Sequence, residues 1–221
     1  MARKADPAPS TARVVRQYID THPTVRDALS MDIVNLSALT RRIMEATGLR
    51  KEEAILVACR RYTPQPVQKG YEAGIRRVLD KSKLEVRTRV AVLTVRSSWR
   101  LMGKLEKALH DLQGRNDPVH LLHGSESITV ICDEGRVDGL EETLGAEEVI
   151  KRRGGLVEVN IRSPELIDEV PGILAFLATS LASRGINFVE VISCHKDNMF
   201  LIDEKDLFHA FEVLNGLIRA G

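Results

Sequence analysis

The chain has 221 residues, of which 43% are hydrophobic and 29% are charged, a composition typical of a folded globular protein rather than a disordered or fibrous one. Its longest apolar stretch, GILAFLATSLA at residues 172–182, is shorter than the roughly 18 residues of a membrane span, and the first residues lack the apolar core of a signal peptide. These features predict a cytoplasmic protein without a membrane partner. Three cysteines without a CxxC pair, Cys59, Cys132 and Cys194, encode neither disulfides nor a zinc site, and we expect all three to be buried.

The net charge of +1 conceals an uneven distribution along the chain. Residues 1–85 contain 16 Lys and Arg against 10 Asp and Glu, whereas residues 86–221 contain 16 against 21. A basic front half and an acidic back half indicate two modules with different partners. Chance variation in the charged surface residues explains this uneven distribution equally well.

The front half has the pattern of a small helical domain. Residues 1–10 are polar and contain two prolines, which predicts a disordered lead. Apolar residues then recur at helical spacing, and we predict an all-helical domain over residues 11–66. Asn35 or Ser37 can cap its third helix, and Gly48 can end that helix. A basic helical linker is predicted over residues 67–84.

Beyond the linker the pattern changes to strands, and it occurs twice. RTRVAVLTVR at residues 87–96 and LVEVNI at residues 156–161 alternate apolar and polar residues, and a helical pattern follows each. LTVRSS aligns with VNIRSP at an offset of 66, and two later Asp-Glu pairs align at an offset of 70. We predict two duplicated domains, residues 85–154 and 155–221, each ordered strand, helix, strand, strand, helix.

The two copies differ at their ends. EVIKRR at residues 148–153 can supply the closing strand of the first copy, whereas the second copy reaches Gly221 one strand short of a βαββαβ unit. The predicted fold class is therefore α+β, with tandem ferredoxin-like domains preceded by a small all-α domain. Because an unpaired sheet edge tends to find a partner, we expect the copies to pack together and the chain to form a homodimer.

The second copy resembles an ACT domain, the amino-acid-sensing module appended to aspartokinases and other enzymes of amino-acid metabolism. VPGILAFLATSLASRGINFVEVISC at residues 170–194 and NMFLIDEKDLFHAFEVL at residues 198–214 carry the likeness, which is nearest in character to the tandem domains of aspartokinases. The first copy matches more weakly, with Gly103 in place of Gly172 and without the acidic residues that precede it. No kinase domain accompanies the repeats, so the resemblance implies a free-standing regulator rather than the enzyme.

The resemblance implies that an amino acid or a similar small metabolite binds at the loop before the second copy's helix. The residues themselves fit, because a glycine lets a ligand approach the backbone and a helix start attracts a carboxylate. Acidic side chains beside the loop can hold an ammonium group, and an asparagine can reach a ligand bound between adjacent domains. The alternative is a simple turn with solvated carboxylates. The predicted ligand-binding residues are Asp168, Glu169, Val170, Pro171, Gly172, Ile173 and Asn187.

The stretch TVRDALSMDIVNLSALTRRIMEA at residues 24–46 resembles a helix-turn-helix. In that motif the second helix enters the DNA major groove, and its exposed polar residues contact bases and phosphates. A small helical bundle with a solvated basic face has the same pattern. The predicted DNA-binding residues, all expected to be exposed, are Ser37, Thr40, Arg41 and Arg42.

No catalytic, metal or cofactor site is predicted. His120 and His123 stand three apart on a strand and therefore point to opposite faces, and no glycine-rich nucleotide loop is present. The Ser193-Cys194-His195 sequence lacks an orienting acid. We predict a non-enzymatic regulator that binds a small metabolite at its ACT-like domains and signals through its helical domain, as a DNA-binding transcriptional regulator. The alternative is a regulatory subunit that binds an amino-acid biosynthetic enzyme without DNA.

Overall fold

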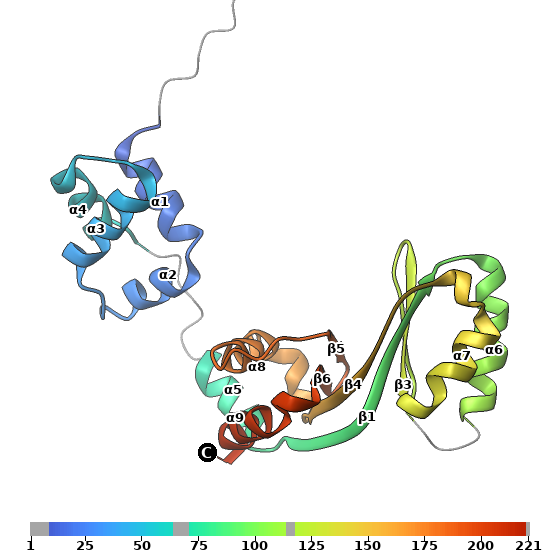
Figure 1. The fold of residues 1–221 in the computed structure, drawn as a ribbon. Helices are drawn as coiled ribbons and strands as arrows, with labels where there is room; N and C mark the ends of the chain where they lie inside the picture. Colours follow the sequence, from blue (N-terminus) through green and yellow to red (C-terminus); the bar gives the residue numbers. More distant parts are fainter. Residues whose placement is uncertain (1–8, 64–70, 114–117, 220–221) are drawn as a thin grey trace, which may run out of the picture. The chain divides into compact units, whose positions relative to one another are not determined.

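The computed structural model describes residues 9–63, 71–113 and 118–219, and the chain divides into two compact units, Met1–Lys69 and Gly70–Gly221. The architecture is α+β, with a small helical unit followed by a unit of two sheet-and-helix lobes, which confirms the predicted fold class (Figure 1). Most of the predicted disordered lead, residues 1–8, lies outside the described residues. Within the described parts of the chain, no helix is both long and apolar enough to cross a bilayer.

The N-terminal unit is a bundle of four helices around one apolar core. Ile19, Ile43 and Ile55 are fully buried at its centre. The side chain of Asn35 accepts a hydrogen bond from the Ala38 amide at 3.1 Å, so Asn35 is the N-cap of the third helix, one of the two residues predicted for that place. Gly48 ends the same helix in the left-handed conformation, as predicted. The helices are α1 (Thr11–Asp20), α2 (Pro23–Ser30), α3 (Leu36–Thr47) and α4 (Glu52–Arg60).

The C-terminal unit is built on one six-stranded antiparallel sheet in the order β2-β3-β1-β4-β6-β5. Its strands are β1 (Lys83–Arg96), β2 (His120–His123), β3 (Ser127–Asp133), β4 (Val149–Arg162), β5 (Glu190–Cys194) and β6 (Asp197–Asp203). Its helices are α5 (Tyr71–Leu79), α6 (Trp99–Gln113), α7 (Val137–Leu144), α8 (Ile173–Ala182) and α9 (Leu207–Arg219). Short 3-10 turns follow β3 and β6 at equivalent places, η1 (Glu134–Arg136) and η4 (Glu204–Asp206), which agrees with the internal duplication.

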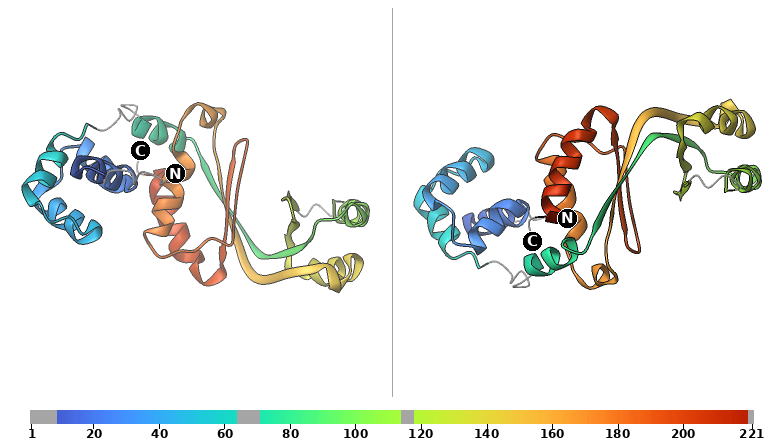
Figure 2. Two further views of the ribbon diagram at one scale, coloured as in Figure 1. Left: turned by 90° about the horizontal axis from the view of Figure 1, so that it is seen from above. Right: turned by 90° about the horizontal axis from the view of Figure 1, so that it is seen from below.

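Strands β1 and β4 are long and run through both lobes (Figure 2). The first lobe contains β2, β3, the second half of β1 and the first half of β4, with helices α6 and α7. The second lobe contains the first half of β1, the second half of β4, β6 and β5, with helices α8 and α9. Each lobe therefore has the strand order of a complete ferredoxin-like sheet.

The closing strand that the second copy lacks in sequence is supplied by the beginning of β1. Residues 83–87 pair with residues 158–162 of β4, at the sheet edge that we predicted to be open. The expectation of an unpaired edge was wrong, because the pairing segment lies at the start of the first copy, far from the second copy in sequence. The predicted boundary between residues 154 and 155 consequently falls inside β4.

The point where the two strands pass from one lobe to the other is irregular. The β1–β4 register shifts between Arg87 and Val90, and Arg89 has a positive φ of 57°. On β4 this crossing carries Gly154 and Gly155, and Gly155 has a φ of 65° that favours glycine. A bulge increases local twist, so this junction allows the two halves of each strand to serve different lobes.

The helices of each lobe cover one face of the sheet. Val157, Val159 and Ile161 of β4 point into the core beneath α8 and α9, whereas Leu156 on the same strand belongs to a smaller apolar cluster on the other face. Helix α5 also belongs to the second lobe, because Ile75, Val78 and Leu79 are buried in its core. The segment interpreted as a linker thus includes a structural helix of that lobe.

The cysteine prediction was correct at two positions and wrong at the third. Cys59 and Cys132 are buried, but Cys194 is exposed. Cys194 ends β5, an edge strand whose side chains are only partly covered, so its place in the sheet and not its residue type decides its exposure.

Candidate functional site

The loop between β4 and α8 carries most of the predicted ligand-binding residues. It contains a short 3-10 turn, η3 (Glu165–Glu169), and ends at Gly172, whose φ of 89° is in the left-handed region. Gly172 is the N-cap of α8, and no side chain caps this helix. The first-turn amides of α8 therefore have no partner within the helix and can donate hydrogen bonds to a negatively charged group.

The predicted residues of this loop differ in their accessibility. Asp168, Glu169 and Pro171 are exposed, whereas Val170 is half-buried. Ile173 is buried in the second lobe's core, so only its backbone faces the loop.

Asn187 does not lie with the other predicted residues within one lobe. It follows α8, whereas Gly172 precedes it. Ten residues of helix span about 15 Å, so the two lie at opposite ends of α8. A ligand at the Gly172 loop could therefore contact Asn187 only if that asparagine came from an adjacent domain. This agrees with the predicted role of Asn187, which was to reach a ligand bound between two domains.

The turn between β5 and β6 holds the loop in place. The Ser163 amide donates to the Lys196 carbonyl at 2.7 Å, and the Lys196 ammonium contacts the Glu165 carboxylate at 2.7 Å. The hydrogen bond and charge of Lys196 lower the pKa of Glu165. Lys196 has no signal in the sequence, because its proximity to Ser163 comes from strand pairing over more than thirty residues.

Beneath the same loop lies a buried amide with an unused donor. Asn198 on β6 is 1% exposed and pairs with Ile161, two residues before the loop begins. Its Oδ1 accepts a hydrogen bond from the Ser193 hydroxyl at 3.1 Å, while its Nδ2 has no partner among the described residues. A buried polar group without a partner costs about 1 to 3 kcal/mol, so this position favours an acceptor from a ligand or water.

Helix α5 lies directly against the loop. A Cβ atom added at Gly74 would meet the Val170 Cγ1 atom at 3.0 Å. The Ser82 hydroxyl, just beyond α5, is 3.1 Å from the Ser163 hydroxyl at the loop's other end. The loop is therefore supported by a helix that the sequence repeat does not contain.

The first lobe lacks an equivalent of this loop. Helix α6 begins immediately after β1, and the Ser98 hydroxyl accepts a hydrogen bond from the Leu101 amide at 3.2 Å. Gly103 lies inside α6 rather than before it, so its alignment with Gly172 was wrong. A side chain already caps this helix start, and the two lobes differ where the ligand was predicted.

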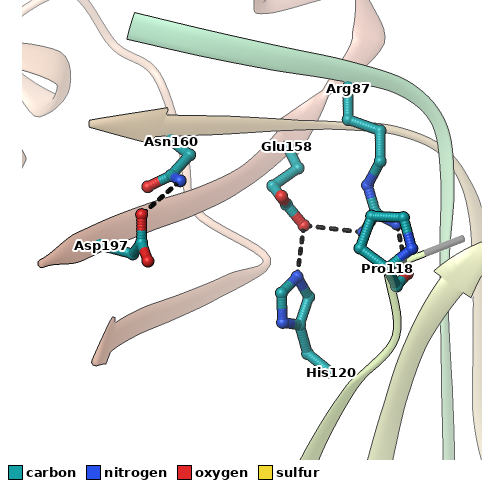
Figure 3. Close-up of polar contacts among 6 residues, drawn as sticks. All are labelled: Arg87, Pro118, His120, Glu158, Asn160 and Asp197. Atoms are coloured by element: carbon teal, nitrogen blue, oxygen red, sulfur yellow. Dashed lines mark hydrogen bonds and ion pairs between the residues drawn. The ribbon is translucent and has the colours of Figure 1, made fainter. Parts of the chain in front are cut away.

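A second polar cluster lies on the sheet face away from the helices (Figure 3). Glu158 accepts hydrogen bonds from Arg87 at 2.8 Å and from His120 at 2.9 Å. Burial raises the pKa of Glu158, but the hydrogen bond from His120 and the charges of Arg87 and His120 outweigh it, so the pKa lies below its ordinary value. This cluster joins β2 of the first lobe to the second half of β4.

The histidines on β2 have different partners. His120 contacts Glu158, whereas His123 Nε2 lies 2.8 Å from the Ser97 hydroxyl. Among the described residues, no group of three or more His, Cys, Asp or Glu side chains has the arrangement of a metal site.

In the N-terminal unit, α3 presents only part of the predicted DNA-binding set. Ser37, Arg41 and Arg42 are exposed, and Arg42 lies 3.9 Å from Glu45. Thr40 was wrongly expected to be exposed: its exposure is 0%, and its hydroxyl donates to the Leu36 carbonyl at 2.8 Å. Thr40 faces the bundle core, because it stands one residue after buried Leu39 on the inner side of the helix.

Comparison with known proteins gives a sequence match within residues 152–216 and structural matches over 62% of the chain. Residues 152–216 match the family model of the ACT domain, and no curated protein matches the sequence. The aspartate kinase of Clostridium acetobutylicum is similar at a TM-score of 0.51 and 14% identity, over 62% of this chain and 34% of that enzyme. The regulatory subunit of aspartate kinase from Thermus flavus is similar at a TM-score of 0.50 and 15% identity, over 62% of this chain and 97% of that subunit. At these identities the two structures establish a shared fold.

Proposed function

Because residues 152–216 match the family model of the ACT domain, we propose that this chain is a non-enzymatic regulatory protein whose second lobe binds an amino acid or a related small metabolite. The observation that carries the proposal is the uncapped start of α8, together with the Nδ2 group of Asn198, which has no partner among the described residues and stands opposite Ile161, just before the loop. Both features offer donors to a ligand at the same end of the lobe.

The chemistry of the loop suits a zwitterion. The ligand carboxylate meets the first-turn amides of α8, where the helix dipole favours negative charge. Asp168 and Glu169 supply carboxylates for the ligand ammonium group. Gly172 has no side chain between the ligand and the backbone, which allows the close approach that this geometry requires.

Thermal denaturation in the presence of each of the twenty amino acids tests the proposal. A ligand at about one hundred times its dissociation constant stabilises the folded chain by about 2.7 kcal/mol, which raises the melting temperature measurably. Gly172→Asp should abolish that increase, because it adds a carboxylate at the ligand's own carboxylate position. Gly185→Asp is the matched control, since Gly185 has a φ of 74° at the other end of α8 and a Cβ there meets nothing within 4 Å. The proposal fails if no amino acid raises the melting temperature.

We propose that the N-terminal unit binds DNA, and that this binding is the response to the ligand of the second lobe. Ser37, Arg41 and Arg42 lie on α3, the second helix of the helix-turn-helix-like pair, and are exposed there. Phosphate contacts make binding weaken as salt increases. An electrophoretic shift with genomic fragments should therefore weaken with salt and be lost in the Arg41→Gln/Arg42→Gln variant.

The control for DNA binding is Arg100→Gln/Lys107→Gln, which removes the same charge from the exposed side of α6. Equal loss in both double variants would indicate a general effect of net charge. Absence of any shift at low salt removes the DNA proposal.

The second candidate output is contact with an enzyme of amino-acid biosynthesis. Met31 and Ile33, in the turn between α2 and α3, are 56% and 70% exposed, and large exposed apolar side chains favour a protein surface. In that case Met31→Ser/Ile33→Ser should abolish association with the enzyme, whereas Arg41→Gln/Arg42→Gln should not.

The position of Asn187 is our reason to propose a homodimer. The earlier reason, an open sheet edge, no longer applies, because β1 closes that edge. If the ligand lies between adjacent domains, a second chain brings its Asn187 to the loop, and ligand should increase the mass measured by light scattering. Asn187→Ala should then weaken ligand binding, while a monomer at every ligand concentration would contradict the proposal.

A further inference from the structure

The Glu158 cluster connects the two lobes across the sheet face that carries no helices (Figure 3). Glu158 on β4 and Arg87 on β1 belong to the second lobe and contact each other at 2.8 Å. Their further partners belong to the first lobe. His120 of β2 lies 2.9 Å from the Glu158 carboxylate, and the Pro118 carbonyl, just before β2, accepts a hydrogen bond from Arg87 at 2.5 Å. Both long strands are therefore attached to the segment that begins β2.

The sheet register shows that the contact between His120 and Glu158 is not one between neighbouring strands. Cross-strand pairs through β3 and β1 place His120 level with Arg153 on β4. Glu158 stands five residues beyond Arg153, so in a flat sheet His120 and Glu158 would be about 20 Å apart. A distance of 2.9 Å requires the sheet to curl until the helix-free faces of the two lobes approach each other.

The approaching faces bury a small apolar cluster of their own. Ile131 pairs with His120 and Leu201 pairs with Glu158, so this apolar cluster lies on the same face as the polar contacts. Because the helices lie on the other face, the two lobes shield these side chains from water by covering each other. The members, all at most 1% exposed, are Val90, Val92, Ile131, Leu156 and Leu201, and we name them the interlobe core.

The strands that join the lobes are suited to bending where they cross. Arg89 on β1 and Gly155 on β4 stand 66 residues apart, at equivalent places of the repeat, and have φ values of 57° and 65°. The β1–β4 register shifts between Arg87 and Val90. A hinge consists of a few such residues that absorb changes of φ and ψ. The crossing therefore provides a hinge between the lobes, and the Glu158 cluster spans it.

We propose that the Glu158 cluster is a clasp that holds the two lobes closed about the hinge at Arg89 and Gly155. With the clasp intact, the lobes cover the interlobe core. When the clasp is broken, the lobes separate at that core, while each lobe keeps its own helix-covered core. Hydrogen bonds to an ionised carboxylate are stronger than those between neutral groups, which suits Glu158 to this role. The clasp does not depend on ligand binding at the loop before α8.

Cysteine labelling of the full chain tests the clasp. Val92→Cys places a thiol in the interlobe core, and Cys194→Ser removes the exposed natural thiol. Cys132, buried in the helix-covered core of the first lobe, reports unfolding of that lobe. Iodoacetamide modifies a buried thiol only when its surroundings open, and peptide mass spectrometry measures each thiol separately. His120→Ala should accelerate modification of the introduced thiol, relative to Cys132, by about tenfold to hundredfold.

His123→Ala is the matched control. His123 lies on the same strand, but its partner is the Ser97 hydroxyl of the first lobe at 2.8 Å, so its loss should leave the ratio of the two labelling rates unchanged. Glu158→Gln keeps the size of the side chain but removes its charge, and should reproduce the effect of His120→Ala. The proposal is overturned if both thiols accelerate equally in His120→Ala and Glu158→Gln, or if neither accelerates. It is equally overturned if His123→Ala has the same effect as His120→Ala.

Discussion

Gly74 on α5 lies so close to Val170 that a Cβ atom at residue 74 would meet the Val170 Cγ1 atom at 3.0 Å. Replacing a glycine in a helix interior by alanine usually stabilises the helix by about 1 kcal/mol. We expect Gly74→Ala to yield less than this, because the new methyl group must displace Val170. Urea denaturation measures the difference in the free energy of unfolding.

Two comparisons isolate the Gly74–Val170 contact. Gly103→Ala on α6 should give the full gain, since a Cβ at Gly103 meets nothing within 4 Å. In a chain that already carries Val170→Ala, Gly74→Ala should recover most of its gain, with a coupling of about 0.5 kcal/mol or more. Equal gains at Gly74 and Gly103 would contradict the close approach of α5 to the loop.

The Glu158 cluster predicts a pH dependence of stability. The pKa of Glu158 is lower in the folded chain than its ordinary value of about 4.3, so the unfolded chain binds the proton more readily. The resulting stabilisation is complete above the unfolded pKa and is lost as the pH falls through the folded pKa. Glu158→Gln should remove this part of the pH dependence.

Glu158→Gln should also lower the free energy of unfolding at neutral pH by about 1 to 3 kcal/mol, because Arg87 would lose its ionised partner in a partly buried place. Urea denaturation of the natural sequence and of Glu158→Gln, at several values between about pH 3 and pH 7, measures both the pH dependence and the loss of unfolding free energy. Glu85→Gln is the control, since Glu85 is exposed and its ion pair with Arg162 is 4.0 Å long. Identical pH profiles for the natural sequence and Glu158→Gln would disprove the role of the cluster.

The three cysteines should differ in reactivity. Burial raises the pKa of Cys132 to about 11 and also raises that of Cys59, whereas Cys194 is exposed. The thiolate is the reactive form, so DTNB at about pH 8 should modify one thiol rapidly and the others only after unfolding. Cys194→Ser should abolish the rapid phase, and two rapid thiols in the natural sequence would contradict the buried positions.

Because strand β1 belongs to both lobes, we can predict which segments of the chain fold by themselves. Residues 71–221 contain every strand of both lobes and should unfold cooperatively. Residues 149–221 lack the closing strand and α5, and with them the buried side chains Ile75, Val78 and Leu79. Each such side chain contributes about 1.5 to 3 kcal/mol, which together approaches the whole stability of about 5 to 15 kcal/mol of a domain.

Residues 149–221 should therefore show no cooperative transition by circular dichroism in urea. A cooperative transition of that segment with the stability of residues 71–221 would show that the second lobe does not depend on β1 or α5.

The alternation of apolar residues, their helical spacing and the duplicated Asp-Glu turns were enough to predict the fold class, the four-helix unit and the two copies. These signals are local, because a strand or helix face requires apolar residues at a fixed period wherever it packs. The loop from Asp168 to Ile173 was predicted as a ligand site from the resemblance of residues 170–194 and 198–214 to an ACT domain, and a glycine directly before an apolar helix fits that role.

The tertiary structure alone decided what completes each lobe. Residues 83–87 pair with β4 across some seventy residues of chain, and no local pattern specifies such a partner. The same holds for α5 against Val170, for Lys196 beside Ser163 and for Asn198 beneath the loop, all of which depend on long-range pairing. The sequence by itself determined which elements form, since periodicity is a property of each segment, and the fold determined which of them share a site, since sheet register and helix packing bring distant segments together.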